Sequence, residues 1–214
     1  MNNINGRVVY DNATRALYRA FPNIPVGKFK TTQSYLRLEQ AVVAGQTLYN
    51  FPLLINQGAT FNTEQRLNLQ DSFVVSQLGF FLALPSGATD ATFKLQTYPN
   101  DFLFTNPAQY QIFYNSRLTI SVNNNVIVPA WDLYRHKVVP QTQQTQALGA
   151  GSPEDEISGE EYGFYAVEPN IVLVGSKNYQ VQIELPVGPT PVDANSRVVI
   201  ILRGILAQNS TVVS

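Results

Sequence analysis

Two long apolar runs constrain this chain more than any other feature of its sequence. They are DSFVVSQLGFFLAL at residues 71–84 and RVVIILRGILA at residues 197–207. A nearly continuous apolar run rich in Val, Ile and Phe predicts a strand that is covered on both faces. The first run also holds Gly79, and it predicts a buried strand with a bulge, although its length alone also fits a buried helix. The second, interrupted by Arg203, predicts a central strand.

Further extended runs follow from Tyr35 onward, separated by turn residues. ATFKLQTY at residues 91–98 alternates apolar and polar side chains, which predicts a half-buried strand. The three asparagines at 123–125 stand between two apolar runs and predict a β-hairpin, because Asn tolerates left-handed backbone. Residues 106–115 predict one or two helical turns. Eight to ten strands and at most two short helices together predict an all-β, jelly-roll-like sandwich of two sheets.

Residues 1–33 depart from this pattern and are predicted to form an N-terminal arm, ahead of a single sandwich domain at 34–214. DNATRALYRAF at residues 11–21 predicts a short helix in the arm, ended by the prolines that follow. Two interpretations stay open: the arm packs on its own domain, or it reaches a neighbouring subunit. The candidate assembly residues in the arm are Arg15, Leu17, Tyr18 and Phe21.

A second departure is PQTQQTQALGAGSPEDEISGE at residues 140–160, which holds almost no large apolar side chain. Burial there is too small to offset the entropy of ordering, so the sequence predicts a long exposed loop or a segment ordered by a partner. The register of a calcium-binding loop is missing. Five acidic residues are candidates for contact with a basic partner: Glu154, Asp155, Glu156, Glu160 and Glu161.

Composition narrows the functions that need to be considered. Only 14% of the residues are charged, the net charge is −1, and Lys and Arg are scattered singly, so we expect no direct contact with nucleic acid. No run approaches the roughly twenty apolar residues that cross a bilayer, so membrane insertion is not expected. The chain has no cysteine and one histidine, His136, which we predict at a surface or turn position.

Motifs for catalysis are missing as well. The sequence contains no G-x-S-x-G nucleophile elbow and no phosphate-binding glycine loop. We therefore predict a protein that is not an enzyme and holds no cofactor or metal. One alternative is a module that binds carbohydrate or a cell surface, such as a tail or fibre component, by stacking sugars on Tyr98, Tyr110, Tyr114 and Trp131. The competing interpretation is that these aromatic rings close the core.

Four stretches of the sequence carry a resemblance to a known class of proteins. They are NTEQRLNLQDSFVVSQLGFFLALP, YNSRLTISVNNNVIVPAW, VEPNIVLVGSKNYQVQIELP and SRVVIILRGILA. Together they resemble virion structural proteins of bacteriophages, of the capsid-forming kind built from β-sandwiches. The resemblance implies a virion subunit, made in the host cytoplasm, that assembles with itself and with other virion proteins. Shell, decoration and tail roles stay open.

Overall fold

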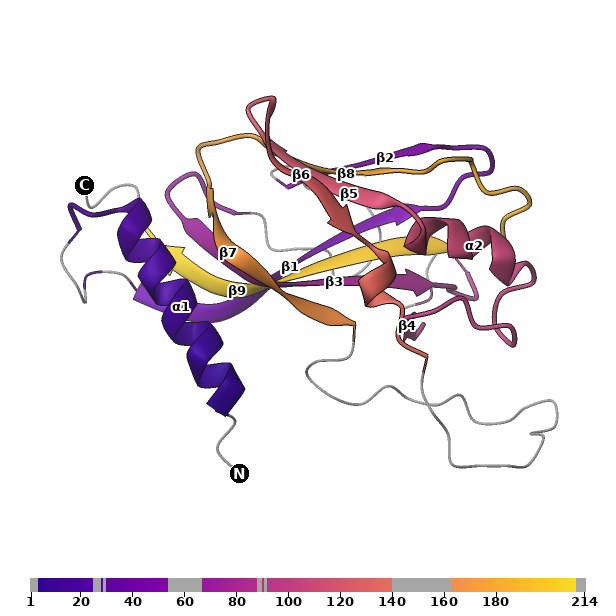
Figure 1. The fold of residues 1–214 in the computed structure, drawn as a ribbon, viewed down its shortest axis with the longest axis horizontal. Helices are drawn as coiled ribbons and strands as arrows, with labels where there is room; N and C mark the ends of the chain where they lie inside the picture. Colours follow the sequence, from indigo (N-terminus) through magenta and orange to yellow (C-terminus); the bar gives the residue numbers. More distant parts are fainter. Residues whose placement is uncertain are drawn as a thin grey trace.

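Two antiparallel sheets form the body of the protein (Figure 1). The computed structural model describes residues 4–24, 28, 30–53, 67–87, 90, 92–139 and 163–210. Sheet A contains β1 (Lys30–Ala41), β9 (Arg197–Gln208) and β3 (Ser72–Ala83) in that order, with β7 (Phe164–Val174) and the two-residue β4 (Leu95–Gln96) on the far side of β3. Sheet B contains β2 (Leu48–Pro52), β8 (Tyr179–Glu184), β5 (Arg117–Val122) and β6 (Asn125–Asp132).

The strand order is that of a jelly roll. Four antiparallel pairs bring the first half of the chain against the second half in reverse order: β1 with β9, β2 with β8, β3 with β7, and β5 with β6. Two further pairings, β3 with β9 and β5 with β8, join these pairs into the two sheets. A long hairpin of eight strands rolled in this way is a jelly roll. The predicted all-β, jelly-roll-like sandwich is therefore confirmed.

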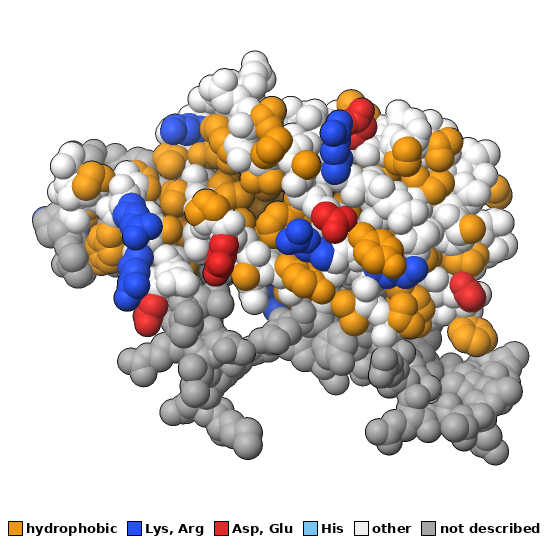
Figure 2. Space-filling view, in the orientation of Figure 1, with side chains coloured by type: hydrophobic (Ala, Val, Ile, Leu, Met, Phe, Trp, Pro, Cys, Tyr) orange, Lys and Arg blue, Asp and Glu red, His pale blue; other side chains and the backbone are white. Residues whose placement is uncertain are grey.

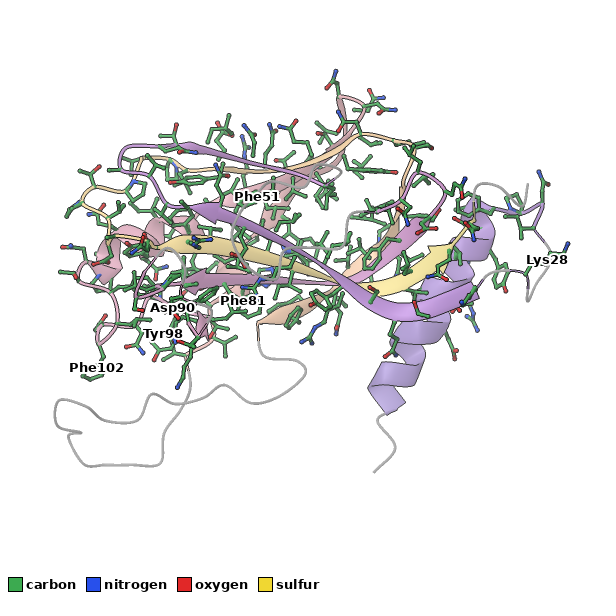
Figure 3. The ribbon with its side chains drawn as sticks, turned by 180° about the vertical axis from the view of Figure 1, so that it is seen from behind. Lys28, Phe51, Phe81, Asp90, Tyr98 and Phe102 are labelled. Carbon is green, nitrogen blue, oxygen red and sulfur yellow. The ribbon has the colours of Figure 1, made fainter. Side chains whose placement is uncertain are left out.

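Aromatic side chains fill much of the space between the sheets. Phe51 points from β2 into the sandwich, as Figure 3 shows, and is 2% exposed. Helix α2 (Pro107–Tyr114) closes one end, where its Phe113 and Tyr114 meet Tyr49 and Phe80 edge to face at centroid distances of 5.2 Å each. Such pairs contribute about 1 kcal/mol beyond the area that they bury. The interpretation that the aromatic rings close the core is thus correct for Tyr110 and Tyr114 of α2.

The structure confirms both of the strands that the apolar runs predict. β3 is buried along almost its whole length and carries a register shift between Val75 and Gln77. The bulge thus lies upstream of Gly79, whose missing side chain makes room instead for Phe164, since a Cβ there would stand 2.6 Å from its ring. β9 lies between β1 and β3, the central position that its sequence predicts.

Other predicted elements are found with different bounds. The asparagine hairpin joins β5 to β6, with positive φ at Asn123 (45°) and Asn124 (68°). The half-buried strand at 91–98 is reduced to β4, because only Leu95 and Gln96 pair with β3. Helix α1 (Ile4–Ala20) is longer than the short helix expected at 11–21, and β1 already begins at Lys30, within the arm predicted at 1–33.

Candidate interaction surfaces

The outer face of sheet A is covered at one end by α1. Ala13 and Leu17 of the helix are completely buried, and they pack against Val74, Ile205 and Ala207 of the sheet. These three sheet residues point away from the main core, which explains why β3 and β9 are apolar on both faces. The helix of the arm therefore packs on its own domain, the first of the two interpretations that the sequence left open.

The other end of this face is covered by the segment after β3. Phe93 and Leu95 pack against Phe81, Ala83 and Val199. Asp90 fixes the turn of this segment, marked in Figure 3. Its carboxylate accepts hydrogen bonds from the backbone N–H groups and the hydroxyls of Ser86 and Thr92, at 2.6 to 2.9 Å, and these bonds hold the pKa of Asp90 well below its usual range.

Charged side chains occupy other positions of the same face. Glu39 is 6% exposed and forms ion pairs with Arg37 and with Arg197, the latter at 3.5 Å between Nη1 and Oε2. The guanidinium of Arg203 lies 3.6 Å from the centroid of the Phe164 ring. A cation above an aromatic face is favourable, so Arg203, which interrupts the second apolar run, has a favourable contact on the surface of sheet A. Sheet A thus has a largely occupied outer face.

The outer face of sheet B is different, since α1 contacts sheet A and α2 lies at the end of the sandwich, so neither described helix covers it. Cross-strand pairing puts two rows of side chains on this face: Leu48, Glu184, Arg117 and Asp132 in one row, and Asn50, Gln182 and Thr119 in the next. Gln182 donates to Asn50 at 2.8 Å, and Arg117 forms an ion pair with Glu184 at 2.7 Å. The result is an open surface of mostly polar side chains, with Leu48 as an exposed apolar residue in the first row.

The most exposed aromatic ring among the described residues belongs to Phe102, on the turn that precedes α2. Phe102 is 85% exposed and projects from the edge of the molecule in Figure 3. The turn that carries it is held by buried Asn100, whose side-chain oxygen accepts from the N–H of Phe102 at 2.9 Å and whose backbone carbonyl accepts from Leu103 and Phe104. A large apolar ring on a fixed turn is the type of residue that anchors protein interfaces.

His136 lies in a buried polar cluster where the two sheets meet. It belongs to the 3-10 turn η1 (Tyr134–His136) after β6, and it is 0% exposed. The indole N–H of Trp131 donates to its Nε2 at 2.8 Å, while its Nδ1 lies 2.7 Å from the carbonyl oxygen of Gly163. Because indole is only a donor, Nε2 must be unprotonated, so Nδ1 carries the proton and donates to Gly163. The surface position predicted for His136 is therefore wrong, although the turn is correct.

Burial controls the charge of this histidine. It lowers the pKa of His136 to about 4, and the hydrogen bond to Gly163 only partly opposes the effect. The neutral ring ties Trp131 of sheet B to Gly163, next to β7 of sheet A, and Tyr165 meets the ring edge to face at 5.2 Å. Gly163 has a φ of +74°, and a Cβ there would stand 2.8 Å from Thr97. The cluster is thus a joint between the sheets.

The predicted assembly residues that the structure describes differ in their burial. Leu17 is buried within its own chain, which corrects its predicted assembly role, because its side chain is used to hold α1 on sheet A. Arg15 is exposed, and Tyr18 and Phe21 are half-buried, with Phe21 packed near Leu17. The acidic residues Glu154, Asp155, Glu156, Glu160 and Glu161 lie outside the described residues.

The predicted sugar-stacking residues do not form a common surface. Tyr110 and Tyr114 are completely buried, and burial raises the pKa of the Tyr110 hydroxyl to about 12. Their prediction as exposed platforms is wrong, because both rings belong to the core side of α2. Tyr98 is half-buried, and one face of Trp131 is covered by the guanidinium of Arg135 at 4.5 Å.

Two of the interaction surfaces, Phe102 and the open face of sheet B, were not predicted from the sequence. Phe102 lies among other aromatic residues of the sequence, and nothing in that segment separates its exposed ring from the buried Phe104 two positions later. The sequence does contain a pattern that indicates the open face of sheet B, since polar and apolar residues alternate in QVQIE at 180–184. Assigning that face required the register of three strands.

Two kinds of site can be considered for the described residues: a metal site and a membrane-spanning helix. No group of three His, Cys, Asp or Glu side chains among these residues has the arrangement that would hold a metal ion. No helix in the described part of the chain is long and apolar enough to cross a membrane.

The sequence matches no protein-family model and no characterised protein. The function must therefore be inferred from the residues of the chain and from their geometry.

Proposed function

We propose that this chain is a non-enzymatic structural subunit of a bacteriophage virion, in the shell or attached to it, and that it assembles through contacts with its own copies and with other virion proteins. The observation that carries the proposal is the jelly-roll strand order. This architecture recurs in viral capsid domains. A shared fold is an analogy, since one fold serves many functions, so the surfaces must support it as well.

The surfaces support an assembling protein. In Figure 2, positive and negative side chains are scattered among uncharged ones. The open face of sheet B offers hydrogen-bonding groups and few charges, and Phe102 offers an apolar anchor at the end of the sandwich. Protein interfaces combine buried aromatic anchors with a polar rim, and they contain few unpaired charges. The bacteriophage origin rests on the resemblance of the four sequence stretches.

Carbohydrate binding has less support from the described residues. Sugar-stacking sites need flat rings with a free face, and two of the four candidate rings are in the core. The two rows on the open face of sheet B contain no aromatic residue. Jelly rolls also occur in lectins, so a glycan array is a useful second measurement on the same sample.

Sedimentation velocity of the purified protein over a wide concentration range tests the proposal. We expect concentration-dependent association, with ordered particles in negative-stain images at the highest concentrations. Phe102→Ala should weaken association. Leu69→Ala, which removes another exposed apolar side chain beside the start of β3, is the matched control and should not. A protein that stays monomeric throughout and binds glycans would contradict the proposal.

A further inference from the structure

Several strands lie at the edges of the two sheets, and most of them have features that hinder pairing with a strand of another molecule. β2 is five residues long and ends in Pro52, β6 contains Pro129 and two register shifts, β7 contains Pro169 and pairs across a shift, and β4 has two residues. Prolines, bulges and short length all protect sheet edges. β1 lacks these features: it contains no proline and pairs with β9 at twelve consecutive positions without a shift.

Hydrogen bonds just beyond β1 show which of its backbone groups point outward. The N–H of Val42 donates to Ser196 at 2.8 Å, so Val42 faces the β9 side. Backbone groups alternate in direction along a strand, and Val43 accordingly faces away, where the Tyr49 hydroxyl accepts from its N–H and donates to its C=O at 3.3 Å each. By the same alternation, the N–H and C=O of Gln33 and Tyr35 point away from β9.

Among the described residues, the outward groups of Gln33 and Tyr35 have no partner comparable to Tyr49. Within the described part of the chain, neither residue makes a backbone hydrogen bond on that side. Side chains leave this part of the edge accessible. Thr32 and Gln33 point to opposite faces of the sheet and both are exposed, and Tyr35 is 53% exposed. Figure 3 shows β1 along the near side of sheet A in the view from behind.

We propose that β1 pairs with β1 of a second copy of this chain, antiparallel, so that sheet A continues from one copy into the next. The partner strand is inferred from the strands of the chain itself. Pairing along β1 needs a second edge strand that is equally long and regular, and among the described strands only β1 meets this requirement. A two-fold pairing centred on Gln33 places Lys30 opposite Leu36 and sets no like charges against each other. The inference rests on the self-assembly in the proposed function and names one of its contacts.

Single cysteines test this contact directly, because the natural chain has none. Directly opposed residues of antiparallel strands have Cα atoms about 4.5 to 5.5 Å apart, within the range that a disulfide spans. We expect Gln33→Cys, at the centre of the two-fold pairing, to form a covalent dimer rapidly under mild oxidation. Ala130→Cys, also exposed on a strand but in β6, is the control and should stay largely uncrosslinked. Crosslinking at residue 33 no faster than at residue 130 would overturn the inference.

Two neighbouring prolines provide an independent test. Gln33→Pro removes an N–H that points outward, so the fold should persist while association weakens at least tenfold. Ser34→Pro removes an N–H that points toward β9 and should lower the melting temperature markedly. Wild-type protein that associates as strongly as folded Gln33→Pro would refute the β1 contact and leave the proposed function standing. If the wild type does not associate at all, the same sedimentation data refute both.

Discussion

The outer faces of the two sheets differ in what covers them, and the difference corresponds to the pattern of apolar and polar residues in their strands. Sheet A carries apolar residues on both sides of β3 and β9, and α1 and the segment around Phe93 cover much of its outer side. Sheet B alternates polar and apolar residues, and its outer side has no described helix. A strand that is apolar on both faces thus requires the chain to supply a cover, whereas an alternating strand leaves its outer face for solvent or a partner.

Removing the cover of sheet A should have the largest effect. Leu17→Ala deletes a fully buried side chain between α1 and the sheet, and we expect it to lower the free energy of unfolding by about 2 to 5 kcal/mol. Chemical denaturation measures this change. Arg15→Ala, at an exposed position of the same helix, is the control and should change stability by less than about 0.5 kcal/mol. Equal, small effects of both variants would mean that α1 does not hold to the sheet.

Acid should weaken the joint between the sheets. The pKa of His136 is about 4 in the folded protein and near 6.5 when unfolded, so the unfolded chain binds more protons between these values. Stability from the neutral ring is complete above about pH 6.5 and is lost as the pH falls toward 4, by up to about 3 kcal/mol.

Denaturation at several pH values, with the fluorescence of the only tryptophan as the signal, measures this loss. Trp131 donates a hydrogen bond to His136, so its fluorescence emission reports directly on the contact between the two sheets at this histidine. His136→Gln keeps a hydrogen-bonding side chain without the titration, and its stability should depend less on pH in this range. Identical pH profiles for the two proteins would show that His136 is not responsible.

The open face of sheet B should tolerate changes that sheet A does not. Gln182→Ala removes the hydrogen bond to Asn50 across β8 and β2, at a half-buried position. We expect a loss near 0.5 to 1 kcal/mol, the lower part of the range for one hydrogen bond. A loss of several kcal/mol, measured by thermal unfolding, would show that this face is as tightly packed as the one under α1.

The smallest effect should come from the ion pair on the same face. Arg117 and Glu184 have side chains that are 61% and 62% exposed, and exposed pairs contribute at most about 1 kcal/mol. Arg117→Ala should therefore leave the melting temperature nearly unchanged. If it instead reduces association, as measured by sedimentation, the face is a contact surface; unchanged association would restrict assembly to other surfaces.

The sequence was informative wherever local pattern and burial coincide. The apolar runs predicted β3 and β9 because both faces of these strands are buried, and Asn123 and Asn124 predicted the hairpin because they adopt positive φ. Pattern failed for His136, since a polar residue in a polar stretch looks exposed until Trp131 and Gly163 are brought to its two nitrogens. The interaction surfaces depend on register and on which helix covers which face, and neither is a local property of the sequence.

The position of β9 in the sheet has a consequence for folding during synthesis. This strand follows every other described strand in the chain, yet it lies between β1 and β3 in the middle of sheet A. While the ribosome is still synthesising residues 197–208, β1 and β3 have no neighbour between them, and the apolar sides of β3 lack part of their packing. Sheet A must therefore form after the other strands have emerged, and the waiting nascent chain exposes apolar surface that is prone to aggregation.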